Sequence, residues 1–333
     1  MFSQHQMLKT ILAAACLSLS TWAQSSPPAG ALIVRQGNTG RGEHATISSA
    51  VAALAGLTGP KTIFVYPDIH NEIMGMADLE HAICSNRVTV RAAISAAQTG
   101  SNAKSATIWA HSADIQISNL NVINSFGTGT DTQALALASA GQRQAFSFCS
   151  FSSFQDTVKV DGSAYFIGSR IEGAVDFVFG SGSAWFESVI MAVKASPYAK
   201  TITAQRNSPG GKTAFVFSRS QVISAGATRG STYLGRPWSE YASVVFQSCS
   251  LSDIINPAGW SVWAPNNPQT AHVRFQEYQN NGPGASTSAR QFGTQRTSPV
   301  LIESILGSCA VQNSRRRKSS TCHLRGAIIQ ENP

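Results

Sequence analysis

The chain has 333 residues, which is enough for one large domain or two smaller ones with a substantial core. Only 13% of the residues are charged, whereas Ser, Thr, Ala, Gly and Asn are plentiful, and this composition argues against a mainly helical protein and favours an exported all-β one. The net charge is +8, but half of it lies in residues 315–333, so the body is only mildly basic. Such a body suits a polyanionic ligand, although charge alone does not distinguish a polyuronate from a nucleic acid.

Residues 1–23 are predicted to be a signal peptide. Lys9 precedes the apolar run Ile11–Leu19, and Thr21–Ala23 provides a cleavage site before Gln24. The run is too short to span a bilayer, and the alternative of a buried helix is disfavoured because a polar stretch follows at once. We therefore expect a secreted, extracellular protein that has no membrane contact once the leader is removed.

The first element expected in the mature chain is a short helix over residues 46–54. Ile47, Val51 and Leu54 fall on one of its faces, and the strand Lys61–Tyr66 follows, closed by Pro67. An apolar face on a short N-terminal helix predicts a cap that covers the open end of a stacked structure.

Short β-rich segments then recur between residues 105 and 259, with end points separated by roughly 20–30 residues. Uneven steps of this size predict a parallel β-helix, a single solenoid in which each repeat forms one coil. A β-sandwich is the alternative; it requires hairpin turns, of which Asp161-Gly162 is one. The segments are Ile115–Val122, Phe146–Phe151, Tyr165–Ile171, Trp185–Ile190, Phe215–Val222 and Val244–Leu251.

Two aspartates occupy the same place in consecutive repeats. Asp156 lies five residues after Phe151, and Asp176 lies five residues after Ile171. If each repeat is one coil, the two backbones lie about 4.8 Å apart. Two acids that close cannot both ionise freely, so one keeps its proton while the other is a carboxylate. The spacing thus predicts a proton donor beside a nucleophile or base.

The cysteines and histidines do not point to a metal site. The cysteines left after the leader is removed are scattered and lack a CxxC or Cys/His ligand spacing. Cys149 and Cys249 each precede an apolar repeat residue by two positions, so we expect both in the core. We interpret His70, His81 and His111 as structural or solvated.

Five motifs together resemble the signature of the pectin methylesterases, family eight of the carbohydrate esterases. The resemblance extends from about Gly30 to Gly307, includes a further segment at Phe275–Ala285, and is closest to the single-domain fungal members. It implies a right-handed parallel β-helix over residues 24–308 that works without metal or cofactor. The motifs are Gln133–Leu137, Phe154–Thr157, Gly173–Gly180, Leu234–Trp238 and Gly259-Trp260.

The resemblance also implies roles for the acids. Asp176 would be the nucleophile that forms an acyl-enzyme, and Asp156 the general acid that protonates departing methanol and then activates water. Arg236 would keep Asp176 ionised and oriented, because a guanidinium stays charged at any relevant pH. Taken alone, each of these residues also has a purely structural explanation; a single aspartate, for example, often forms a turn.

Three more residues match the family's pattern. Gln133 and Gln155 correspond to amide donors for the developing oxyanion, and Trp238 offers a flat face to a sugar ring. For Trp260 and Trp263 the sequence leaves two readings open, as groove-lining or as core residues.

Two regions depart from the family. The stretch Asp68–Glu72 keeps only its glutamate. The strand expected next is replaced by Met74–Ala82, and a familiar pattern resumes near Asn86–Val90. Loss of a strand would leave backbone groups unpaired, so we expect a distorted end. Residues 309–333 form a basic tail without apolar periodicity, which we expect to be disordered.

The expected function is hydrolysis of methyl esters in methyl-esterified polygalacturonate by a secreted monomer that does not bind nucleic acid. A β-helix enzyme that cleaves the polygalacturonate chain is one alternative, although the polygalacturonase Gly-His-Gly and Arg-Ile-Lys patterns and a lyase-like calcium site are absent. An inactive pectin-binding wall protein is the other.

Overall fold

The computed structural model describes residues 27, 29–37, 39–54, 62–66, 69–71, 74–76, 81–129, 131–198 and 200–307. For 69–71, 74–76 and 81–87 only the backbone is described. The predicted signal peptide (1–23) and basic tail (309–333) lie outside these residues.

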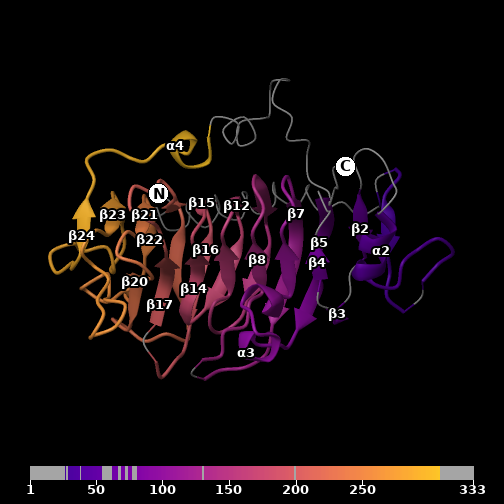
Figure 1. Cartoon of the computed structure of the whole chain (residues 1–333), viewed down its shortest axis with the longest axis horizontal. Coiled ribbons are helices and arrows are strands. Elements are labelled where there is room, and N and C mark those ends of the chain that lie inside the picture. The colour runs from indigo at the N-terminus through magenta and orange to yellow at the C-terminus, as the bar shows by residue number, and fades with distance from the viewer. Residues whose placement is uncertain are drawn as a thin grey trace, which may run out of the picture.

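The described strands form three ladders that run along the long axis of the molecule, from α2 at one end to β24 at the other (Figure 1). All pairings between these named strands are parallel, as in β10–β13, β11–β14 and β12–β15. This confirms the parallel β-helix and rules out the sandwich alternative, because a sandwich is built from antiparallel hairpins.

From β9 to β20, each coil contributes one strand to each ladder. The first ladder contains β9 (Gln144–Ser147), β12 (Ser163–Ile167), β15 (Ser183–Glu187), β18 (Phe215–Ser218), β21 (Ser243–Gln247), β23 (Arg274–Tyr278) and β24 (Gly293–Gln295). The second contains β10 (Ser150–Ser152), β13 (Arg170–Gly173), β16 (Ile190–Lys194), β19 (Gln221–Ala225) and β22 (Ser250–Leu251). The third, which carries the candidate site, contains β4 (Met74–Met76), β6 (Ile108–Ala110), β8 (Leu137–Ser139), β11 (Val158–Val160), β14 (Val175–Gly180), β17 (Lys200–Gln205) and β20 (Thr232–Pro237).

The first and second ladders merge toward the N-terminal end into one sheet. The strands that join them are β5 (His81–Ala92) and β7 (Gln116–Asn124). The strands β1 (Leu32–Val34), β2 (Ile63–Val65) and β3 (Ile69–Asn71) extend the sheet beyond β5. The long strand β7 pairs with both β9 and β10, so it spans both ladders.

The register of the predicted repeats is confirmed with one correction. Phe151 pairs with Val122 on one side and Ile171 on the other, and Val222 pairs with Leu251. The fourth repeat ends at Met191 rather than Ile190, because Met191 is the residue opposite Ile171 and Val222. The prediction was one residue out because Ile190 and Met191 are both apolar.

From the second repeat on, the predicted segments are two strands rather than one. One residue with a left-handed backbone separates the two strands of each segment, and the chain turns there from the first ladder to the second. These corner residues, with φ between 51° and 57°, are Phe148, Gly168, Ser188, Arg219 and Ser248. The sequence hides these corners because non-glycine residues seldom adopt positive φ, and the halves on either side are equally apolar.

A stack of phenylalanines fills the core. Ring centroids of successive residues lie 4.8, 4.8, 4.4 and 4.5 Å apart, and all the rings are buried. Cys149 and Cys249 are buried as predicted, and burial raises the pKa of each thiol to about 12. The stacked residues are Phe146, Phe166, Phe186, Phe217 and Phe246.

The N-terminal cap is confirmed. Helix α2 (Ile47–Leu54) begins after Thr46, whose hydroxyl accepts the backbone N–H of Ser49, and it buries Ile47 and Leu54 at the end of the stack (Figure 1). Two shorter helical turns, α3 (Ala96–Thr99) and η2 (Ala103–Ser105), lie in the connection from β5 to β6.

The predicted loss of a strand after β2 is wrong. Strand β5 pairs with β2 on one side and with β7 on the other, with a register shift between Ile83 and Val88, and β4 pairs with β6. Ladder bonds join backbone groups, so a segment can complete the coil without matching the family's side chains.

The C-terminal segment returns along the outside of the first ladder. Helix α4 (Glu303–Leu306) lies over β15, and the amide of Gln247 holds the backbone of Val300 through both its oxygen (2.9 Å) and its nitrogen (3.2 Å). Within the described residues, no helix has the length and apolar character needed to cross a bilayer.

Candidate active site

Asp156 and Asp176 lie at equivalent positions on consecutive coils, as their spacing predicted. Gln155 pairs with Val175 and Val158 pairs with Val178, so the acids between them are aligned. Both have left-handed backbones, with φ of 63° and 48°, and both are nearly buried, at 6% and 4% exposure. The corner residues of the coil share this conformation, so what distinguishes Asp156 and Asp176 is that two carboxyl groups are buried on adjacent coils.

A β-bulge accounts for the conformation of Asp176. Val175 pairs with Thr201 and Val178 with Thr203, so Asp176 and Phe177 together face the single residue Ile202. A bulge adds one residue to one strand, interrupts the ladder there and re-aims the side chain. Phe177 is buried in the core, and Asp176 is free to face its polar partners.

Arg236 binds the carboxylate of Asp176 from two strands away. Its Nε lies 3.0 Å from Oδ1 and 3.1 Å from Oδ2, and its Nη2 lies 2.6 Å from Oδ2. Although burial opposes the charged form, the hydrogen bonds and charge of Asp176 raise the pKa of Arg236. Charge-assisted paired bonds of this kind fix both distance and orientation, so Arg236 holds the Asp176 carboxyl group in one position.

The pKa of Asp156 is shifted upward. Burial, followed by the negative charge of Asp176, raises the pKa of Asp156 well above its usual value, while the charges of Arg236 and Lys159 offset only part of this effect. Asn102, next to η2, donates its amide N–H to Oδ2 at 3.4 Å. Desolvation and a like charge both favour the neutral form of a carboxyl group.

The two glutamines line up beside the acids. Gln133 and Gln155 face each other in a parallel bridge on neighbouring coils, and Gln155 directly precedes Asp156. The amide oxygen of Gln155 accepts the backbone N–H of Thr132 at 3.2 Å. Since an N–H requires an acceptor, this bond fixes the amide so that its NH₂ group is left to donate elsewhere.

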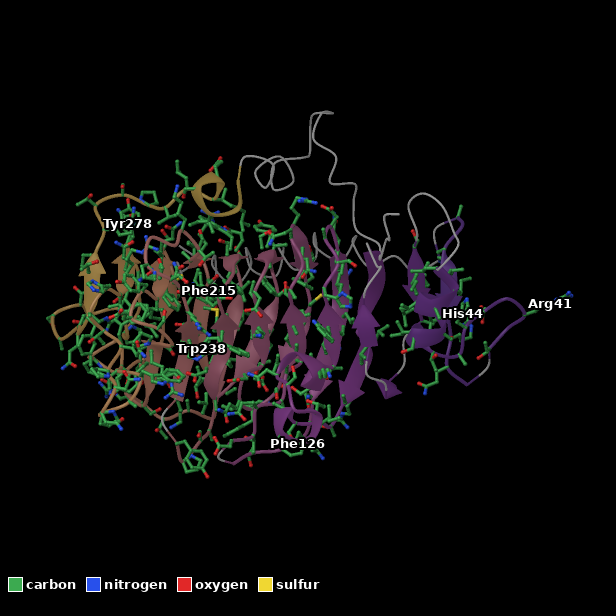
Figure 2. All side chains as sticks on the ribbon, in the orientation of Figure 1. Arg41, His44, Phe126, Phe215, Trp238 and Tyr278 are labelled. Carbon is green, nitrogen blue, oxygen red and sulfur yellow. The ribbon has the colours of Figure 1, made fainter. Side chains whose placement is uncertain are left out.

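Trp238 adds an aromatic ring directly after β20. It follows Arg236 by two residues, is partly exposed, and packs on Phe179 with ring centroids 5.9 Å apart. Figure 2 shows it on the flank of the coil that carries β14 and β17. The guanidinium carbon of Arg206 lies 5.4 Å from the centre of its ring.

The structure separates the two tryptophans that the sequence left open. Trp260 is fully buried and stacks on Phe275 at 4.3 Å, so it is a core residue. Trp263 is partly exposed and belongs to the site, since its carbonyl accepts Nη1 of Arg236 at 3.2 Å and its ring lies 4.3 Å from the guanidinium carbon.

Sequence reasoning missed two residues that touch the acids. Asn102 contacts Asp156, and Thr201 contacts both the backbone and the carboxylate of Asp176. Neither lies in a motif near its acid in sequence, so only the pairing of distant strands could reveal them. In the described part of the chain, no three His, Cys, Asp or Glu side chains gather as a metal-binding group.

Comparisons with known proteins identify the family. The family model described as pectinesterase matches residues 33–296. A pectinesterase from Aspergillus aculeatus is 35% identical over 91% of this chain and 97% of its own length. The crystal structure of a pectin methylesterase from Aspergillus niger superposes with a TM-score of 0.75 at 31% identity, over 86% of this chain and 97% of that one. A pectin methylesterase in complex with a hexasaccharide is similar at 25% identity and a TM-score of 0.72, over 85% and 98% of the two chains. The chain therefore belongs to the pectinesterase family.

Proposed function

We propose that the protein is a secreted, monomeric carboxylic ester hydrolase that converts methyl-esterified homogalacturonan and water into pectate and methanol. The observation that carries the proposal is the pair of buried acids, in which Arg236 holds Asp176 as a carboxylate and Asp156 has a raised pKa. Such a pair supplies a nucleophile and a proton donor to the same bond.

In the first half-reaction, an oxygen of Asp176 attacks the carbonyl carbon of the methyl ester and forms a covalent bond to it. The carbonyl oxygen gains negative charge, and amide N–H groups of Gln133 and Gln155 stabilise it. When this intermediate collapses, the bond to the methoxy oxygen breaks and Asp156 donates its proton, so methanol leaves and an acyl-enzyme remains.

The second half-reaction reverses these roles. Asp156, now a carboxylate, takes a proton from water as the water oxygen attacks the acyl carbon. The bond to Asp176 breaks, which restores the Asp176 carboxylate beside Arg236 and the protonated Asp156. One water is consumed and one galacturonic acid and one methanol are produced.

The substrate class is supported by the relatives and by the surface around the acids. The similar proteins are named pectinesterases, and one solved pectin methylesterase holds a hexasaccharide. Trp263 lies against Arg236, Trp238 follows Arg236 by two residues, and both tryptophans are partly exposed. Flat aromatic faces suit sugar rings. Secretion rests on the predicted leader at residues 1–23.

Methanol release from methylated polygalacturonate tests the proposal. The purified protein should liberate methanol and acidify the solution, with no fall in the viscosity of the polymer. Viscosity loss without methanol would favour a chain-cleaving enzyme, and pectin binding without either change would favour an inactive wall protein. Absence of methanol from a correctly folded sample contradicts the proposed function.

A further inference from the structure

We propose that Thr201 is a positioning residue for the nucleophile, which locks the backbone and the carboxylate of Asp176 with a single hydroxyl group. The inference rests on the proposed role of Asp176 in ester hydrolysis. It assigns a function to a residue on β17 that lies 25 positions along the chain from the acid it holds.

The bulge in β14 creates the need for such a residue. Because Asp176 and Phe177 together face Ile202, the regular ladder is interrupted at Asp176. The backbone N–H of Asp176 is donated instead to Oγ1 of Thr201 at 3.1 Å. A buried N–H without an acceptor would be costly, so the hydroxyl stabilises the left-handed backbone of Asp176.

The same hydroxyl also holds the carboxylate. Thr201 donates its proton to Oδ1 of Asp176 at 2.5 Å, using the donor and one acceptor position of a group that has one donor and two acceptors. With Arg236 on Oδ2, each carboxylate oxygen has its own short contact from a different strand. The plane of the carboxylate is therefore fixed from two sides.

Thr201 and Arg236 hold Asp176 in different ways. The guanidinium reaches from β20, two strands away, and its side chain is 24% exposed, whereas Thr201 lies on the adjacent strand and is 1% exposed. Because Thr201 is buried, it does not contact the polymer. Its loss should therefore lower kcat while leaving KM nearly unchanged.

Thr203 provides a matched control. It lies two residues further along β17, is fully buried, and donates its hydroxyl to the carbonyl of Leu234 at 2.9 Å without touching either acid. Thr201→Val and Thr203→Val thus remove the same atoms from the same strand, and only the first removes a contact to the nucleophile. Thr201→Ser keeps the hydroxyl.

The experiment compares the three variants with the wild type on methylated polygalacturonate. Thr201→Val should lose about 10²-fold in kcat, the scale of a misplaced reacting group, with KM within about twofold. Thr201→Ser should recover most of the lost kcat. The kcat of Thr203→Val should stay within about threefold of the wild-type value, although the Tm of this variant should fall by about as much as that of Thr201→Val. Equal kcat values for the two valine variants, or a serine variant as slow as Thr201→Val, would overturn the proposal.

Crystal structures of the two valine variants give a readout that does not depend on turnover. Asp176 should leave its left-handed conformation or its contact with Arg236 in Thr201→Val and keep both in Thr203→Val. An unmoved Asp176 in Thr201→Val contradicts the positioning role. Absence of methanol release by wild-type enzyme would count against the proposed function alone, because the displacement of Asp176 is measured separately.

Discussion

Inside the coil, five phenylalanines from Phe146 to Phe246 stack with ring centroids 4.4–4.8 Å apart, whereas on its flank Asp156 and Asp176 depart from the regular ladder. Non-glycine residues with positive φ occur next to the stack, at corners such as Phe148 and Ser188, and also at the two acids. At the corners they turn the chain in a repeated way, and on the flank they belong to the two acids. Regular repetition thus supplies stability, and a local departure from it supplies chemistry.

This comparison predicts that substitutions in the two regions have opposite signatures. Asp176→Asn should lower methanol release by about 10⁴-fold or more, because an amide cannot act as the carboxylate nucleophile. The circular dichroism spectrum should remain that of the wild type. Asp114→Asn, which alters a surface acid paired with Arg143, is the control and should keep full activity. Substantial turnover by Asp176→Asn would exclude the acyl-enzyme.

Phe186→Ala tests the other half of the comparison. Phe186 stacks between Phe166 and Phe217, so its removal leaves a cavity and should cost about 3–5 kcal/mol of unfolding free energy. Denaturant unfolding measures the loss, and kcat per folded molecule should change little. Phe292→Ala, at a ring that is 40% exposed, should shift stability by no more than about 0.5 kcal/mol. A large fall in kcat for Phe186→Ala would show that the core and the site are coupled.

Arg236→Lys should reduce kcat by about 10²-fold, because an ammonium cannot reproduce the paired contacts of a guanidinium with Asp176. Arg143→Lys is a matched control, since Arg143 makes the same two-bonded contact with Asp114 on the surface, through Nε at 2.7 Å and Nη2 at 2.6 Å. Steady-state kinetics on methylated polygalacturonate measures both. Similar kcat values for the two lysine variants would contradict the orienting role of Arg236.

Asp156→Asn should show a smaller effect, on the pH dependence of stability. The unfolded chain has an aspartate pKa of about 3.9, whereas burial and the charge of Asp176 raise the pKa of Asp156 in the folded protein. Between these values the folded state binds more protons than the unfolded state, so wild-type stability falls as pH rises through this window. Asparagine does not titrate, so the Tm of Asp156→Asn should increase relative to wild type as the pH rises above about 4. A difference in Tm that is independent of pH would exclude the raised pKa.

The sequence predicted the fold through distances along the chain. Apolar residues at the ends of the repeats, such as Phe151 and Ile171, pair as expected, because in a stacked coil residues at equivalent places in consecutive repeats face each other. The one-residue error at Ile190 and the hidden corners at Phe148 and Ser188 share a cause: apolar side chains alone do not report φ. The strand β4 was missed because backbone pairing does not require the family's side chains.

What the sequence by itself determined is the placement of the two acids, since five residues separate each from a paired core residue and the coil converts equal spacing into equal position. Only the tertiary structure decided what holds them. Thr201, Asn102 and Trp263 reach the site from strands and loops far away in sequence, through a bulge and a register that depend on the packing of whole coils. A linear pattern records distance along one strand, whereas the state of a carboxyl group depends on neighbours that the folded chain brings across several strands.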